Sequence, residues 1–218
     1  MAVLDPLKVV ITNWPTDADG APVVEEVELI NNPENADDGV RTAPFSGTLY
    51  IEHDDFQADP PPKYYRLTPG REVRLRGGYF VTATGFESDA DGNVTEVHVT
   101  YDPDTKGGNA PDGRKVKSTM HWVSAAHAVD ADVATYERLF SAEIPGAETG
   151  DVFDDLHPNS MTVLRGCKLE PELANTAPGD VVQFERLGYF AADPHTPLLF
   201  HRTVGLRDEW ANIQKRKK

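Results

Sequence analysis

The sequence predicts an all-β protein made of two consecutive antiparallel β-barrels. Its 17 prolines and 17 glycines interrupt the 218-residue chain at short intervals. The segments between them are rich in β-branched and aromatic residues and have the length of strands. No stretch shows the periodicity of a long amphipathic helix. Many short strands without a covering helix are typical of closed or nearly closed barrels.

Six predicted strands fall within the first 125 residues, namely 7–12, 23–30, 45–51, 72–81, 94–101 and 117–124. Within 72–81, Arg74 and Arg76 alternate with apolar residues, so the two arginines are expected on one face of the strand. Asp91-Gly92-Asn93 is typical of the turn of a hairpin. These strands predict that residues 1–125 form the first barrel.

The second half continues in the same style, and residues 126–218 are predicted to form the second barrel. The expected strands are 160–165, 180–191 and 198–205, with 132–140 either a strand or a short helical turn. Residues 150–156 are expected as a short helix or irregular turn, 174–179 as a loop, and 208–218 as a brief helix that frays. Exchange of strands near the boundary and at the C-terminus is compatible with this division.

Composition excludes several classes of protein. The single cysteine, Cys167, rules out an intramolecular disulfide framework and a cysteine-based zinc site, and it fits a reducing cytoplasm. No apolar run approaches the roughly 20 residues that span a bilayer. The first residues lack the basic and apolar regions of a signal peptide. We therefore expect a cytoplasmic protein without a membrane partner.

The net charge of −15 is unevenly distributed along the chain. Residues 1–62 contain thirteen acidic and two basic residues, whereas 63–76 contain five basic and one acidic residue. Residues 114–117 (RKVK) and the last four residues (KRKK) add further basic clusters. Because a polyanion is bound by a local patch, the acidic total does not exclude RNA. It predicts a confined binding surface on a protein that otherwise repels phosphate.

The segment 63–76 interleaves tyrosines with arginines. Arginine binds phosphates and base edges, and aromatic rings stack on unpaired bases, so this composition suits single-stranded RNA. A solvated basic strand that balances the acidic segment before it has the same composition. The residues alone leave both interpretations open.

No cluster of side chains predicts a catalytic or metal site. His121 and His127 are six residues apart, which is the wrong spacing for a helical pair of metal ligands. The aspartates of 102–112 do not follow the pattern of a calcium loop. No phosphate-binding glycine loop is found, and a lone cysteine is more often structural than nucleophilic. The chemistry indicates a binding module with no catalytic residue, no metal ligand and no cofactor of its own.

Eight ordered blocks cover essentially the whole chain: DPLKVVI, PFSGTLYIEHDDF, YYRLTPGREVRLRGGYFV, YDPDT, DGRKVKSTMHWVSAAHA, YERLFSAEIPG, VQFERLGYF and HRTVGLRDEWA. In this order they resemble the C-terminal anticodon-binding region of bacterial-type glutaminyl-tRNA synthetases. The resemblance implies two β-barrels that bind the anticodon stem-loop of tRNA-Gln. It also implies an N-terminal class I catalytic domain that uses ATP and Mg²⁺ to attach glutamine, and whose signatures are absent here. Met1 then corresponds to an internal residue of a longer, monomeric enzyme.

The resemblance implies that eight residues contact the anticodon: Pro33, Lys63, Tyr65, Arg66, Arg74, Arg76, Gln183 and Arg186. Arg66, Arg74 and Arg76 stand where the family has arginines. Lys63 and Tyr65 replace a glutamine and a lysine.

Contacts to the central anticodon base are implied for three of these residues. Gln183 and Arg186 match a glutamine and an arginine that reach this base, and Pro33 matches a loop proline beside it. Glu34 and Gly77 stand where asparagines are usual, so two family contacts are expected to be lost. A further family arginine corresponds to a position before Met1.

Three alternatives remain at this point. A glutamyl-tRNA synthetase of the archaeal or eukaryotic type shares the two barrels, and amino-acid choice lies in the absent domain. A stand-alone RNA-binding barrel, like the ribosomal protein that binds 5S RNA, would have roughly half this length. A carbohydrate- or protein-binding barrel would use Trp14, Tyr64 and Tyr65 as an exposed platform.

Overall fold

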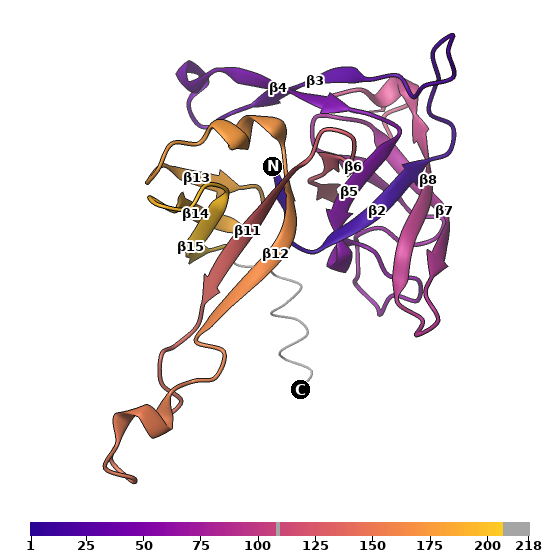
Figure 1. The fold of residues 1–218 in the computed structure, drawn as a ribbon. Helices are drawn as coiled ribbons and strands as arrows, with labels where there is room; N and C mark the ends of the chain where they lie inside the picture. Colours follow the sequence, from indigo (N-terminus) through magenta and orange to yellow (C-terminus); the bar gives the residue numbers. More distant parts are fainter. Residues whose placement is uncertain (108–109, 207–218) are drawn as a thin grey trace.

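The computed structural model describes residues 1–107 and 110–206 (Figure 1). Strands dominate these residues, and the helices among them are short 3-10 turns. The all-β, two-barrel prediction is confirmed. Within the described ranges, no helix has both the length and the apolar character needed to cross a membrane. The helix expected at 208–218 and the KRKK cluster lie outside the described residues.

The first barrel is a seven-stranded sheet in the order β10-β5-β2-β8-β7-β6-β9. Its strands are β2 (Pro6–Ile11), β5 (Thr48–Glu52), β6 (Glu72–Leu75), β7 (Phe80–Ser88), β8 (Val94–Asp102), β9 (Thr119–Met120) and β10 (Val123–Ser124). The two edge strands, β9 and β10, are separated in the chain only by His121 and Trp122. The segment 119–124 therefore bridges the two edges and closes the barrel around Trp122, which is fully buried.

The second barrel is a six-stranded sheet in the order β1-β12-β11-β15-β14-β13. Its strands are β1 (Ala2–Val3), β11 (Val129–Tyr136), β12 (Met161–Leu169), β13 (Val181–Phe184), β14 (Gly188–Ala192) and β15 (Leu199–Gly205). Most neighbours in the two sheets are antiparallel, but β2 pairs with β8, β6 with β9 and β11 with β15 in parallel. Strand β1 reaches this sheet from the N-terminus and pairs with β12.

Alternate residues of the N-terminal segment pack into different cores. Met1 and Val3 belong to the hydrophobic core of the first barrel, whereas Ala2 belongs to the core of the second. This is the period-two alternation of an extended strand. The segment thus lies between the barrels and contributes to both cores.

A two-stranded hairpin of β3 (Glu25–Ile30) and β4 (Val40–Phe45) extends across the top of both barrels (Figure 1). Its apolar face packs on the first core through Val27, Leu29 and Phe45. At its far end Arg41 donates to the Glu170 carboxylate at 2.8 Å, just beyond the end of β12. The hairpin therefore connects the two barrels along one side.

The loop between β11 and β12, residues 137–160, projects away from the second barrel as an arm (Figure 1). It contains a 3-10 turn at Val152–Asp155, where a short helix or irregular turn was expected. Leu139, Ile144 and Phe153 expose 56%, 72% and 72% of their surface. The arm thus presents an unusual concentration of apolar side chains to solvent.

Several strand boundaries differ from those predicted. Residues 72–81 form two strands, β6 and β7, and 180–191 likewise form β13 and β14. Strands β1 and β4 were not predicted, and 132–140 is represented by the strand β11, which begins at Val129. A run of strand-forming residues does not show whether a short interruption within it is a tight turn.

The turn between β6 and β7 depends on Gly77. Its backbone has φ +65°, and a Cβ there would lie 2.5 Å from Leu29 Cδ2 and 3.1 Å from the Glu28 carbonyl oxygen. Glycine therefore supplies both the left-handed conformation and the space for the hairpin that crosses above.

We predict that Gly77→Ala lowers the free energy of unfolding by at least about 2 kcal/mol, because backbone strain is added to a steric clash. The matched control is Gly92→Ala at φ +85°, where nothing lies within 4 Å of the added Cβ. The control loses only the strain of the left-handed region, about 1 kcal/mol. Urea unfolding of both variants measures the difference, and equal losses would contradict the packing role of Gly77.

Candidate nucleic-acid interface

A groove lies where the crossing hairpin meets both barrels. Its volume is about 680 Å³, and its lining includes Pro33, Arg76 and Gln183. These residues come from the loop after β3, the turn after β6 and the strand β13. The structure therefore brings together three predicted contact residues that are as much as 150 positions apart in the chain.

The groove is lined by both hydrogen-bond donors and hydrogen-bond acceptors. Arg76 lies 3.8 Å from the Glu185 carboxylate, and both side chains remain more than one-third exposed. Gln183 is exposed, so its amide can donate to and accept from a ligand. At the other wall, Arg41 donates to Glu170 and also to the Asn31 side-chain oxygen at 3.0 Å. Such a lining suits a polar, planar group with both donors and acceptors.

A buried carboxylate holds two further predicted residues together. Asp55 is fully buried and accepts a bidentate pair of hydrogen bonds from Arg186 at 2.7 and 2.8 Å. Arg66 lies on the same carboxylate at 3.4 Å. Arg66 belongs to the first barrel and Arg186 to the β13–β14 turn of the second. One carboxylate thus fixes two guanidinium groups at the junction of the barrels.

The β13–β14 turn presents Arg186 in a left-handed conformation, with φ 68°. This conformation is uncommon for a residue other than glycine and is retained when surrounding contacts determine it. The bidentate ion pair with Asp55 is such a contact. The turn geometry and the ion pair therefore select the same position for this side chain.

Asp55, Arg66 and Arg186 form a cluster that we call the Asp55 clamp. Hydrogen bonds connect this clamp to the N-terminal segment. The Arg186 guanidinium donates to Nδ1 of the buried His121 at 3.4 Å, and His121 Nε2 lies 3.3 Å from Glu52. Glu52 in turn accepts hydrogen bonds from the backbone N–H groups of Leu4 and Asp5 at 2.8 and 3.0 Å. A continuous polar chain thus connects the site to the crossing between β1 and β2.

The remaining predicted residues lie elsewhere on the first barrel. Arg74 is half-buried on β6 with its guanidinium 5.1 Å from the centre of the Phe80 ring. Tyr65 is about half-exposed and lines a separate cavity of about 320 Å³. Lys63 is exposed in a turn with φ 71°. The two arginines were predicted to share one face of a strand. Arg74 lies within β6, but Arg76 lies just beyond its end.

The alternative of an aromatic binding platform is wrong. Trp14 is 9% exposed and packs on Phe45 and Tyr101, while its indole N–H donates to the Val23 carbonyl at 2.7 Å. Tyr64 is buried, with its hydroxyl donating to the Asp54 carbonyl at 3.0 Å. Of the three proposed platform residues, only Tyr65 is exposed.

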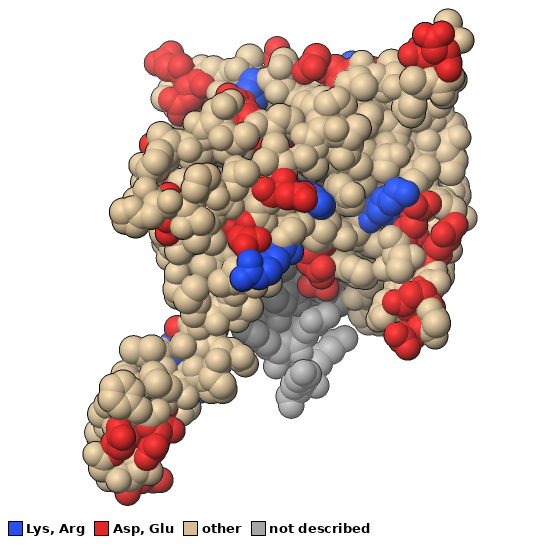
Figure 2. All heavy atoms as spheres, in the orientation of Figure 1, with Lys and Arg blue, Asp and Glu red and all other residues tan. Residues whose placement is uncertain are grey.

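Acidic side chains lie both at the edges of the face shown in Figure 2 and beside the basic side chains in its central part. They are prominent at the end of the crossing hairpin and at the tip of the arm, and the basic side chains in this view lie mainly in the central part of the face. The hairpin end contains Asp37 and Asp38, and the arm contains Asp151, Asp154 and Asp155. A polyanion would be repelled by the acidic hairpin end and the acidic arm.

Family models described as the anticodon-binding domain of class I tRNA synthetases for glutamate and glutamine (E and Q) match residues 1–102 and 119–193. The chain belongs to this family. Its anticodon-binding domains supply Pro33, Arg76 and Gln183 to the groove, and Arg66 and Arg186 to the Asp55 clamp. The resemblance seen in the sequence is thereby confirmed.

Relatives similar to the whole chain are glutamine–tRNA ligases. Those of Rhodopirellula baltica and Nitrobacter winogradskyi are 51% and 50% identical over 100% and 98% of this chain. The ligase of Pseudomonas putida is 49% identical over 97%. The chain spans only 36–37% of the length of these relatives. It therefore corresponds to the anticodon-binding part of a class I synthetase.

Asp55, His121 and Arg41 contribute to the site but were not predicted as contact residues from the sequence. No local pattern distinguishes Asp55 from the many other acids of residues 1–62, because its bidentate partner Arg186 lies 131 positions away. Its only signal is that it lies within the block PFSGTLYIEHDDF, which carries part of the family resemblance.

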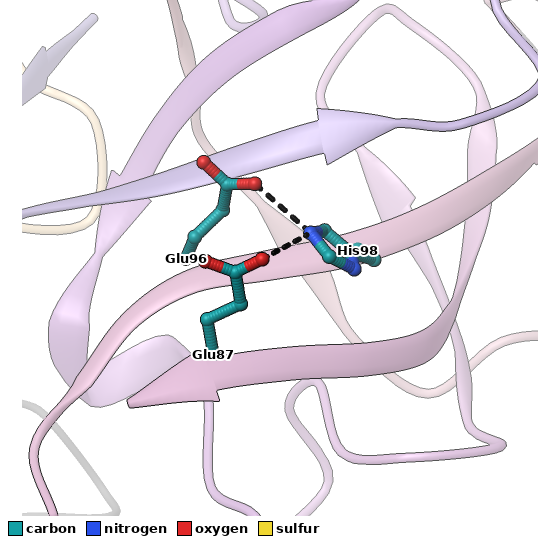
Figure 3. Close-up of side chains that lie close together, drawn as sticks. All are labelled: Glu87, Glu96 and His98. Atoms are coloured by element: carbon teal, nitrogen blue, oxygen red, sulfur yellow. Dashed lines mark hydrogen bonds and ion pairs between the residues drawn. The ribbon is translucent and has the colours of Figure 1, made fainter. Parts of the chain in front are cut away.

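One surface cluster on the first barrel has metal-ligand chemistry. Glu87 and Glu96 face each other across β7 and β8, and His98 lies two residues further on the same face, with ligand atoms within 4.8 Å of one another (Figure 3). His98 Nε2 lies 2.9 Å from Glu96, which also pairs with Lys8 at 2.7 Å and has a lowered pKa because of these hydrogen bonds. The ammonium group of Lys8 already neutralises this carboxylate and competes with any cation.

Cys167 does not have the environment of a nucleophile. It is fully buried, its Sγ donates to the Leu4 carbonyl at 3.4 Å, and burial raises the pKa of the thiol to about 12. The reactive thiolate is therefore disfavoured at neutral pH. The residue acts as a small apolar group in the core of the second barrel.

We predict that Asp55→Asn lowers the free energy of unfolding by about 2–3 kcal/mol, because two partly buried guanidinium groups lose their common carboxylate. Asp59→Asn, at an exposed position nearby in the chain, serves as the matched control and is expected to change stability by less than about 0.5 kcal/mol. Urea unfolding at neutral pH provides the measurement. If both variants were equally stable, the clamp would contribute nothing.

Proposed function

We propose that this chain binds the anticodon stem-loop of tRNA-Gln as part of a glutamine–tRNA ligase. The observation that carries the proposal is the groove, which combines Pro33, Arg76 and Gln183 next to the Asp55 clamp in a member of the anticodon-binding family. The names of the relatives at about 50% identity support glutamine as the amino acid.

The side chains suit an anticodon loop whose bases are turned outward. Gln183 can donate to and accept from a central uridine, which carries carbonyl and imide groups. Arginine forms bidentate hydrogen bonds with the edge of guanine, which suits Arg66 for a guanine at the third anticodon position. Arg74, Arg76 and Arg186 add positive charge for the phosphates. In this proposal Lys63 and Tyr65 lie at the edge of the same contact surface.

The complete enzyme would attach glutamine to tRNA-Gln with ATP and Mg²⁺ in a separate N-terminal catalytic domain. This chain would supply identity recognition and no catalytic residue. We further propose that residues 1–125 and 126–218 are its two domains, with β1 exchanged into the second, and that the enzyme is a cytoplasmic monomer. The pairing of β1 with β12 supports the exchange of this strand into the second domain.

A glutamyl-tRNA synthetase is the second candidate, because the matching family models cover the enzymes for both amino acids. Binding of stem-loops with the tRNA-Gln and tRNA-Glu anticodons to the same protein distinguishes the two. Preference for the tRNA-Glu anticodon would overturn the glutamine assignment.

We predict that Gln183→Ala weakens binding of the tRNA-Gln anticodon stem-loop by about 1–3 kcal/mol and reduces discrimination at the central base. Asn159→Ala, which removes an exposed amide on the arm, is the matched control and should bind as the unaltered chain does. Fluorescence anisotropy with stem-loops that differ only at the central base provides the measurement. Equal weakening for every anticodon would show that Gln183 does not contact a base edge.

We propose that the arm contacts the rest of the longer protein. Its exposed Ile144 and Phe153 would be covered in such a contact. We predict that limited proteolysis cuts the arm in the 218-residue chain but not in the longer protein, and that Phe153→Ser restores cutting there. Equal cleavage of the arm in both proteins would contradict this placement.

A further inference from the structure

The second cavity of the first barrel lies outside the groove. It has a volume of about 320 Å³ and is lined by Tyr65, Arg71, Glu72 and the loop 114–117. Its lining is predominantly basic, with only one carboxylate. None of the basic residues of the loop 114–117 is among the eight predicted anticodon contacts.

The lysines of this region differ from the other lysines of the described residues. Elsewhere each lysine is paired with a carboxylate, as Lys8 is with Glu96, Lys106 with Glu25 and Lys168 with Asp130, at 2.5–2.7 Å. Within residues 1–107 and 110–206, no carboxylate lies within ion-pair distance of Lys63, Lys115 or Lys117. In a protein of net charge −15, these three positive charges are thus left available to an external anion.

The ion pairs of Arg114 account for the absence of a carboxylate partner at Lys115 and Lys117. Its guanidinium binds three carboxylates at once: Glu72 at 2.9 Å, Asp112 at 2.8 Å and Asp102. This contact anchors the start of the loop to the barrel and neutralises the acids next to the cavity. The two lysines that follow are thereby held near the cavity without a carboxylate of their own.

Tyr65 holds one of these lysines in place. Lys117 Nζ lies 4.6 Å from the centre of the Tyr65 ring, and the ring is 48% exposed. A cation–π contact orients an ammonium group without neutralising it, and an ammonium has three N–H donors. Lys117 can therefore bind an anion while it remains over the ring.

We propose that Lys115 and Lys117 form a phosphate subsite for the RNA backbone, with Tyr65 as the positioning residue that holds Lys117. The proposal rests on the proposed function and extends its contact surface beyond the eight predicted residues. A phosphodiester is the anion that fits, because the subsite adjoins residues expected to bind RNA. Tyr65 precedes Arg66 in the chain, and Ser118, next to Lys117, accepts the backbone N–H of Arg74 at 3.0 Å.

The test measures how binding of the anticodon stem-loop to the 218-residue chain depends on salt. Each phosphate contact that is lost should lower the slope of log K against log[salt] by about 0.7–0.9. Lys115→Gln and Lys117→Gln should each show this decrease, whereas Lys168→Gln, which removes a carboxylate-paired lysine, should keep the original slope. The ratio of affinities for the correct and altered anticodons should stay constant, because phosphates carry no sequence information.

Two changes at Tyr65 test the positioning role. Tyr65→Phe keeps the aromatic ring and should keep the salt slope, whereas Tyr65→Leu should lower it although every lysine is still present. Unchanged slopes in both lysine variants, with normal RNA binding by the unaltered chain, would overturn the subsite alone. A changed anticodon ratio would also overturn it, since the lysines would then contact bases. Absence of RNA binding by the unaltered chain would overturn the proposed function and the subsite with it.

Discussion

The buried carboxylate of Asp55 is the interaction on which the geometry of the site depends. A fully buried charge is tolerated only when it is paired and hydrogen-bonded, and here the partners are Arg66 from one barrel and Arg186 from the other. Because this single carboxylate needs both partners, it fixes the position of one barrel relative to the other. It also keeps two guanidinium groups at their junction, where each is still partly exposed to solvent. Removal of the carboxylate would leave both barrels folded around their own cores but without this common anchor.

Two connections reinforce the same junction. The N-terminal segment places Met1 and Val3 in one core and Ala2 in the other, so that it cannot shift without disturbing both. The crossing hairpin packs on the first barrel through Leu29 and reaches Glu170 of the second through Arg41. The groove is the space that these connections leave between them. Its shape is therefore a property of the two-barrel arrangement and not of either barrel alone.

Pairing with carboxylates determines which basic side chains are available to a ligand. Within the described ranges, many basic residues are paired with carboxylates, and Arg114 alone engages three of them. Among the lysines of residues 1–107 and 110–206, those without a carboxylate partner are Lys63, Lys115 and Lys117, close in the chain to Tyr65 or in the loop beside it. A ligand with regularly spaced negative charges can use such a region together with the arginines nearby, whereas the acidic arm and hairpin end repel it elsewhere.

The all-β class and the family could be predicted from the sequence, because they follow from strand composition, turn residues and ordered blocks that are local in the chain. The eight contact residues remain a prediction from the same blocks. The breaks at Gly77 and Arg186 within predicted strands could not be assigned, since each depends on a left-handed backbone that distant contacts stabilise. The roles of Asp55, the Lys117–Tyr65 contact and the strand β1 were decided only by the tertiary structure. The contacts of Asp55 with Arg186, of Lys117 with Tyr65 and of β1 with β12 join residues between about 50 and 170 positions apart. Pairing over such separations is set by the packing of complete barrels rather than by any neighbouring residue.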